Sequence, residues 1–195
     1  MKFFIKQAVL PIIYIVLMAF TAIGVMCMND DAVFLKVGLL ILNLALFAYV
    51  VGAMAYKDGQ DALNIRDAND VERRIIIETG EDRKLKIAEE YAPWKGFGFG
   101  LVACSPLIIL TILQIIFNLC GVSSQVPEII ATYMFMMISS LIQLAGLKGF
   151  AWVVILSLIF VCGCIGIPYI FGAKKIERHK QVIKETHKKI YGKDR

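Results

Sequence analysis

Charged side chains are scarce in this chain of 195 residues, and their scarcity sets its class. Asp, Glu, Lys and Arg make up 19% of the residues, whereas soluble domains carry about a quarter. Residues 7–28, 33–56, 97–119 and 151–173 are apolar runs in which Lys36 is the one Asp, Glu, Lys, Arg or His. Because ionisable side chains inside a membrane mark ion and proton paths, their lack argues against ion-coupled transport.

The four apolar runs have the length of membrane spans. Hydrophobic residues make up 58% of the chain, and the mean hydropathy is +0.70. A helix of about 20 apolar residues crosses a hydrocarbon core of roughly 30 Å. The first run is longer than the apolar core of a secretory signal peptide, so we expect a retained span. The sequence therefore predicts an all-α, multi-pass integral membrane protein of the cell membrane.

Lysine and arginine predict how the chain is threaded. Eight of them lie in residues 57–95 and nine in residues 174–195. Because such residues concentrate in cytoplasmic segments, we expect a transmembrane hairpin at 1–56 and a charged, helical cytoplasmic loop at 57–95. Both termini are then cytoplasmic, which requires an even number of crossings.

A fifth apolar segment, residues 128–148, disturbs this parity. It is interrupted by polar residues and a glycine, and a full crossing would place the basic C-terminal tail outside. A segment of this kind can lie in the interface or enter the membrane and return. We predict four transmembrane helices plus an outer-face re-entrant or interfacial helical segment at 128–148. The alternative is five transmembrane helices.

A glycine-rich stretch, "EEYAPWKGFGFG" at residues 89–100, resembles a phosphate-binding loop at first sight. A dinucleotide loop needs a preceding strand and G-x-G-x-x-G spacing, and a P-loop ends in GK[S/T]. Neither pattern is present. We interpret the stretch as the start of a span, with Tyr91 and Trp94 at the membrane interface and Lys95 reaching the headgroups.

Small residues recur about every three or four positions in three of the spans. Such stripes let helix backbones approach closely in lipid. We predict helix-packing faces at Gly96, Gly100 and Cys104, at Ala45, Ala48, Gly52 and Ala55, and at Cys162 and Gly166.

The stretch that starts at Lys57 carries four candidate metal ligands: Asp58, Asp61, Asp67 and Asp70. Asp58, Gly59 and Ala62 match the D-G-x-x-A that opens the CDP-alcohol phosphotransferase signature. Leu63 stands where that family needs Arg, and the later Gly and Asp residues of the signature are missing. An EF-hand calcium loop also fails, because its turn glycine is absent.

We expect that stretch to form a solvated amphipathic helix instead. Ile65, Ala68, Val71 and Ile75 recur at helical intervals among charged residues. Gly80 is the expected C-terminal cap, and a second short helix is expected at about 82–91.

The tail, residues 174–195, is predicted to be a basic amphipathic helix in the cytoplasm. Its predicted surface for lipid or a partner consists of Lys174, Lys175, Arg178, Lys180, Lys184, Lys188 and Lys189. The helix either lies on anionic lipid headgroups or docks against the acidic side of the 57–95 loop. Two histidines, His179 and His187, have no further ligands beside them, so no metal site is expected.

No catalytic, cofactor-binding or metal-binding constellation emerges from the sequence. Cys27 and Cys120 both fall at the outer face, where a disulfide is allowed. We predict a non-enzymatic membrane subunit or scaffold that presents its charged loop and tail to anionic lipid, a cytoplasmic protein or a second copy. We do not expect nucleic acid to bind. Alternatives are a component of a small-solute transporter or oligomeric pore and, less favoured, a metal-dependent lipid-headgroup enzyme.

Overall fold

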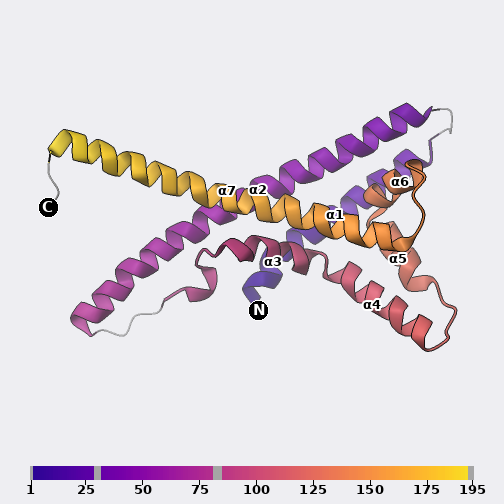
Figure 1. The fold of residues 1–195 in the computed structure, drawn as a ribbon, viewed down its shortest axis with the longest axis horizontal. Helices are drawn as coiled ribbons and strands as arrows, with labels where there is room; N and C mark the ends of the chain where they lie inside the picture. The colour runs from indigo at the N-terminus through magenta and orange to yellow at the C-terminus, as the bar shows by residue number, and fades with distance from the viewer. Residues whose placement is uncertain (1, 29–31, 81–84, 193–195) are drawn as a thin grey trace.

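The computed structural model describes residues 2–28, 32–80 and 85–192, with side chains for residues 9–28, 32–80, 85–189 and 192. These residues form helices and no strand, which confirms the predicted all-α class (Figure 1). The helices are α1 (Lys2–Met26), α2 (Val33–Thr79), η2 (Ile87–Glu89), α3 (Pro93–Ala103), α4 (Ser105–Leu119), α5 (Val126–Met134), α6 (Met136–Leu144) and α7 (Phe150–Tyr191).

Several of these helices are long and apolar enough to cross a membrane. In the described residues, α1, α2 and α7 meet this criterion alone, and the bent pairs α3–α4 and α5–α6 meet it only as pairs. The chain therefore has between three and five candidate spans. It is an all-helical protein with the apolar helices of a membrane-embedded protein.

Helices α2 and α7 extend far beyond the apolar runs in which they begin. They contain 47 and 42 residues, so at 1.5 Å per residue they are about 70 Å and 63 Å long. Neither contains a helix break at residue 57 or 174, where we had placed segment boundaries. Helix α2 ends at Gly80, whose left-handed φ of 72° provides the predicted C-terminal cap. A hydrocarbon core of about 30 Å covers roughly half of each helix.

The two long helices cross near the middle of the molecule, where their backbones come into direct contact (Figure 1). A Cβ atom added to Gly59 would lie 2.0 Å from the Tyr169 carbonyl oxygen. A Cβ added to Gly172 would lie 2.0 Å from the Tyr56 carbonyl oxygen. Each helix thus supplies one glycine against a carbonyl of the other. These two glycines permit the crossing.

Helix α3 packs along α7 in the same manner. A Cβ on Gly96 would lie 2.8 Å from Cβ of Tyr169, and a Cβ on Gly100 would lie 2.7 Å from Cα of Cys162. In the other direction, Gly166 accommodates the ring of Phe97, which would lie 2.5 Å from an added Cβ. The small residues predicted on both helices therefore face each other here, and Cys104 is fully buried at the end of α3.

The small-residue stripe of α2 has a different course from the one we predicted. Gly52 and Ala55 are buried, Ala48 is half-buried and Ala45 is exposed. The face that contacts α7 continues instead through Gly59 and Ala62 into the charged half of the helix. The predicted face was set by the apolar run alone, whereas the actual face follows the crossing with α7.

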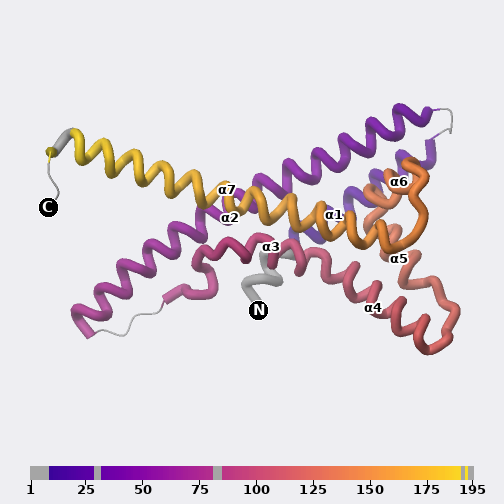
Figure 2. The backbone as a smooth tube through the Cα atoms, in the orientation of Figure 1, coloured from indigo at the N-terminus to yellow at the C-terminus, as the bar shows by residue number. Residues whose placement is uncertain are grey.

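Helices α1 and α2 lie side by side and are joined by polar contacts (Figure 2). The Asn43 side-chain amide donates hydrogen bonds to the Met18 carbonyl oxygen at 3.0 Å and to the Thr21 hydroxyl at 2.9 Å. Lys36, buried to 4% exposure, donates to the Met26 carbonyl oxygen at 3.5 Å. This ammonium lies at the C-terminal end of α1, where the helix dipole favours a positive charge.

The remaining helices form two bent pairs. Helices α3 and α4 meet at Cys104 with a bend of 56°, just before Pro106. Helices α5 and α6 meet at Phe135 with a bend of 96°. Phe135 and Ser139 are buried at this bend, and the Ser139 hydroxyl donates to the Thr132 carbonyl oxygen at 3.3 Å. The bent α5–α6 pair is therefore packed into the protein.

Candidate functional site at the helix crossing

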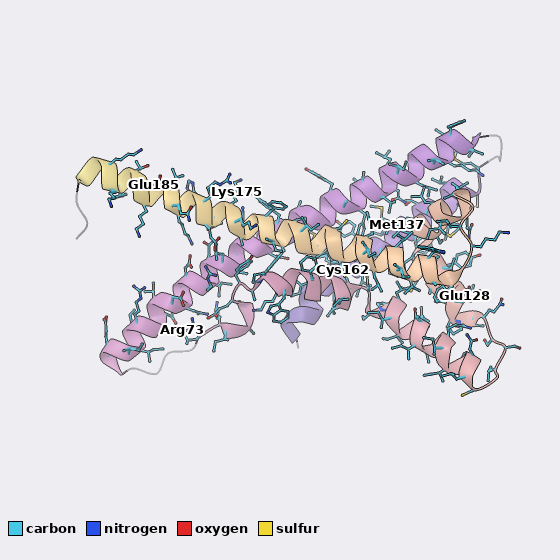
Figure 3. The ribbon with its side chains drawn as sticks, in the orientation of Figure 1. Arg73, Glu128, Met137, Cys162, Lys175 and Glu185 are labelled. Carbon is cyan, nitrogen blue, oxygen red and sulfur yellow. The ribbon has the colours of Figure 1, made fainter. Side chains whose placement is uncertain are left out.

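Most of the charged residues of the molecule lie beyond the crossing of α2 and α7. We refer to residues 57–79 as the α2 arm and to residues 174–191 as the α7 arm. The two arms diverge from the crossing, while the end of α1, the start of α2, the end of α4 and the α5–α6 pair lie at the opposite end (Figure 1). Arg73 lies on one arm and Lys175 and Glu185 lie on the other (Figure 3).

Residues 85–92 form an elbow that packs back onto the α2 arm. The Tyr91 backbone N–H donates to the Ala62 carbonyl oxygen at 3.0 Å. Asn69, 4% exposed, accepts a hydrogen bond from the Lys86 backbone N–H at 3.2 Å and donates one to the Glu90 carboxylate at 2.7 Å. We had expected a short helix at about 82–91. Of that stretch, residues 82–84 lie outside the described residues, and the rest contains only the η2 turn.

Lys95 holds the elbow from the other side. It is buried to 8% exposure, and its ammonium donates to the carbonyl oxygens of Ala88, at 3.1 Å, and Glu90. In the structure its ammonium thus contacts backbone carbonyls of the elbow, whereas the sequence predicts contact with lipid headgroups. The η2 turn ends in backbone carbonyls without helical partners, and the Lys95 ammonium satisfies those of Ala88 and Glu90.

Aromatic rings fill the space between the elbow and α7. Tyr91 stacks on Tyr169 with ring centroids 5.5 Å apart, and Phe99 meets Tyr169 edge-on at 5.8 Å. The Arg66 guanidinium lies 5.8 Å from the centre of the Tyr91 ring, a cation–π distance. Burial raises the pKa of Tyr91, the Glu177 carboxylate raises it further, and the Arg66 charge opposes both.

The α7 arm docks on the α2 arm only at its base. Glu177 pairs with Arg66 at 3.5 Å, and Lys180 pairs with Asp67 and contacts the Asn64 side-chain oxygen at 3.5 Å. Lys175 lies 5.8 Å from the Tyr56 ring centre. Docking against the acidic side of the loop, one of the two predicted arrangements, therefore applies to the first turns of the arm.

The outer part of the α7 arm is exposed. Residues 181–189 are exposed throughout, and they include Lys184, Lys188 and Lys189 of the predicted surface. Of the other predicted bases, Lys174 and Arg178 are exposed as well. Residues 193–195 of the predicted tail lie outside the described residues. A basic helical surface thus extends beyond the docked base.

Half of the predicted amphipathic face of the α2 arm is also exposed. Val71 is 58% exposed and Ala68 is exposed, whereas Ile65 and Ile75 are half-buried. The opposite side of the helix, with Ala62, Leu63 and Asn69, is the buried one. The helical periodicity was present in the sequence, but it did not indicate which side meets the elbow and α7.

The acidic stretch of the α2 arm is used for ion pairs and for packing. Asp67 pairs with Lys180, Asp70 pairs with Arg73 at 2.6 Å, and the Gly59 of the D-G-x-x-A pattern forms the crossing. Within the described residues, no three His, Cys, Asp or Glu side chains are grouped so that they could hold a metal ion. His179 and His187 are exposed on the α7 arm.

The two cysteines considered for a disulfide carry free thiols in the structure. Cys27 follows α1 and Cys120 follows α4, and both are exposed. The ends of these two helices lie at separate corners of the molecule (Figure 1).

Comparison of the chain with protein-family models, with curated proteins and with solved structures finds no match.

Proposed function

We propose that this protein is a non-enzymatic, multi-pass membrane scaffold that presents two charged arms to the cytoplasm and binds an acidic partner through the basic α7 arm. The observation that carries the proposal is the continuity of α2 and α7 from apolar half to charged half. A continuous helix transmits the orientation of its membrane-embedded half to its arm. The crossing and the elbow then fix both arms relative to the bundle.

A protein partner fits the α7 arm better than the lipid surface does. The arm continues the axis of an apolar helix and projects about 25–30 Å beyond a 30 Å hydrocarbon core. Lying flat on the headgroups would require a sharp bend near residue 173, where the helix is unbroken. The residues from 174 to the C-terminus include nine Lys or Arg and three Asp or Glu, which favours an acidic partner.

We further propose four transmembrane helices, α1, the first half of α2, α3–α4 and the first half of α7, with α5–α6 as a re-entrant pair on the outer face. The bend of 96° and the burial of Phe135 support this assignment. It places both arms and the N-terminus in the cytoplasm, together with 19 of the 21 Lys and Arg residues.

The partner is tested by charge reversal of the exposed part of the α7 arm. The triple variant Lys184→Glu, Lys188→Glu and Lys189→Glu is compared with the triple Lys→Arg variant, which keeps the charge. The full chain is crosslinked in native membranes, and the captured proteins are separated by isoelectric point. We expect acidic proteins with the wild type and the Arg variant, and their loss with the Glu variant.

Equal capture by the Glu and Arg variants would contradict the proposal. Binding of the arm to anionic vesicles without any protein, lost in the Glu variant, would favour the lipid surface as its target.

The threading is tested by a single cysteine placed after Arg195 in a cysteine-free chain. Protection of this thiol from a membrane-impermeant reagent on intact cells is expected for four spans. Labelling would show that the tail is outside and that α5–α6 crosses the membrane.

A further inference from the structure

The end of the molecule opposite the arms carries two adjoining cavities. The first, of about 320 Å³, lies between α5, α6 and the start of α7. Its polar lining consists of Glu128, Thr132, Ser139, Gln143 and Lys148. It thus brings one carboxylate and one ammonium to the same cleft, and neither is paired with another side chain in the described part of the chain. A third cavity, of about 330 Å³, shares Glu128, Thr132 and Gln143 with this cleft.

The second cavity, of about 410 Å³, is lined by apolar side chains alone. It lies between α2, α6 and α7, and its walls include Leu44, Ile142, Ala145, Leu147, Ile159 and Phe160. Ile142 and Leu147 line both cavities, so the polar cleft and the apolar groove share a wall. Ile159, 65% exposed, lies at the side of the groove that faces out of the protein.

The two cavities lie at different depths along α7. The polar cleft contacts Phe150 and Val153 in the first turn, whereas the groove contacts Leu156, Ile159 and Phe160. At 1.5 Å per residue, the α7 residues that line the groove lie roughly 9–15 Å along the helix from its first residue, Phe150. In the proposed topology this order places charged groups at headgroup level and an apolar groove beneath them.

We propose that the two cavities form one binding site for a membrane phospholipid with an amine-bearing headgroup. Lys148 binds the phosphate, Glu128 accepts hydrogen bonds from the ammonium group, and one acyl chain lies in the groove. A carboxylate and an ammonium in one cleft complement a zwitterion, and the shared wall joins that cleft to a lipid-facing groove. The proposal rests on the outer position of α5–α6 in the proposed topology and requires no partner for the arms.

The site is tested with the full-length protein, delipidated in detergent and titrated with lipids of identical acyl chains. Phosphatidylethanolamine, phosphatidylglycerol and phosphatidylcholine are compared by native mass spectrometry. We expect phosphatidylethanolamine to bind most tightly, because its headgroup has both a phosphate and N–H donors. Loss of one hydrogen bond to a charged group lowers the affinity about tenfold or more.

Substitutions of Glu128 and Lys148 separate the roles of these two side chains in binding the headgroup. Glu128→Gln is expected to lower affinity for phosphatidylethanolamine about tenfold and leave phosphatidylglycerol unchanged. Glu128→Asp, which keeps the carboxylate, is expected to retain the preference. Lys148→Gln is expected to weaken all three lipids by a similar factor.

A steric pair of variants tests the groove. Ala145→Phe fills it and is expected to abolish lipid retention, whereas Ala151→Phe, at an exposed position of α7 that lines neither cavity, is the control. An unchanged preference for phosphatidylethanolamine in Glu128→Gln, or lipid retention in Ala145→Phe, overturns the proposal. The triple Glu variant of the α7 arm should keep the lipid preference of the wild type, so equal partner capture by the Glu and Arg variants would overturn only the proposed scaffold.

Discussion

The glycine contacts at the crossing of α2 and α7 lead to a quantitative prediction. In Gly59→Ala, the new methyl group would lie 2.0 Å from the Tyr169 carbonyl oxygen, whereas ordinary contact begins at 3.4 Å. The helices must therefore separate by about 1.4 Å at this point. Neither the methyl group nor the carbonyl oxygen can move aside, because each belongs to the interior of a continuous helix. Overpacking of this kind costs about 1–3 kcal/mol.

A Gly→Ala substitution where the added Cβ meets no neighbouring atom is expected to raise stability and not to lower it. Gly38 is on the same helix, and nothing lies within 4 Å of its added Cβ. Gly38→Ala should therefore stabilise the protein by about 0.5–1 kcal/mol, because alanine loses less conformational freedom in a helix. This variant supplies the baseline against which Gly59→Ala is measured.

Thermal unfolding of the purified protein in detergent provides the assay. For a chain of this size, 1–3 kcal/mol corresponds to a decrease in Tm of about 2–12 °C. Gly172→Ala should behave like Gly59→Ala, and the double variant should lose less than the sum, because one separation of the helices relieves both contacts. A Gly59→Ala protein as stable as Gly38→Ala would refute the close crossing.

Two further predictions concern the polar groups of the bundle. Asn43→Ala removes the two hydrogen bonds that Asn43 donates to α1, and we expect a loss of about 0.6–1.7 kcal/mol in unfolding free energy. Wild-type stability of this variant would show that these bonds do not stabilise the contact between α1 and α2. The pKa of Tyr91 is raised above its usual value of about 10, so the folded protein favours the neutral phenol. The neutral phenol therefore stabilises the fold fully below pH 10, and this stabilisation is lost as the pH rises from 10 through the raised pKa. The Tm of the wild type should therefore fall more steeply above pH 10 than that of Tyr91→Phe, and parallel profiles would show that the Tyr91 phenol makes no contribution.

The helical class and the apolar helices could be predicted because they depend on composition and on runs of about 20 residues. The cap at Gly80 could be predicted for a similar reason, since it depends only on the last turn of a helix. In each case the pattern and the structure it specifies lie in the same short stretch of chain.

The candidate site depends on contacts between distant segments, and these were not accessible from the sequence. Gly59 lies among aspartates that suggest a metal site, but its role is defined by Tyr169, 110 residues further along the chain. Lys95 has the sequence context of an interfacial lysine, but the elbow offers it backbone carbonyls instead. A glycine in the middle of a charged helical stretch, where it weakens the helix by about 0.5–1 kcal/mol, was the one available signal.

The position of the crossing gives α7 the mechanics of a balanced lever. Tyr169 and Gly172 lie near the middle of this helix of 42 residues, so about 30 Å of stiff rod extends to either side of the pivot. A tilt of about 5° about that point would displace both ends by roughly 2–3 Å, in opposite directions. One end of the rod borders the polar cleft at Phe150, and the other carries the exposed lysines. A displacement at one end of α7 would therefore reach the other end undiminished in size and reversed in sense.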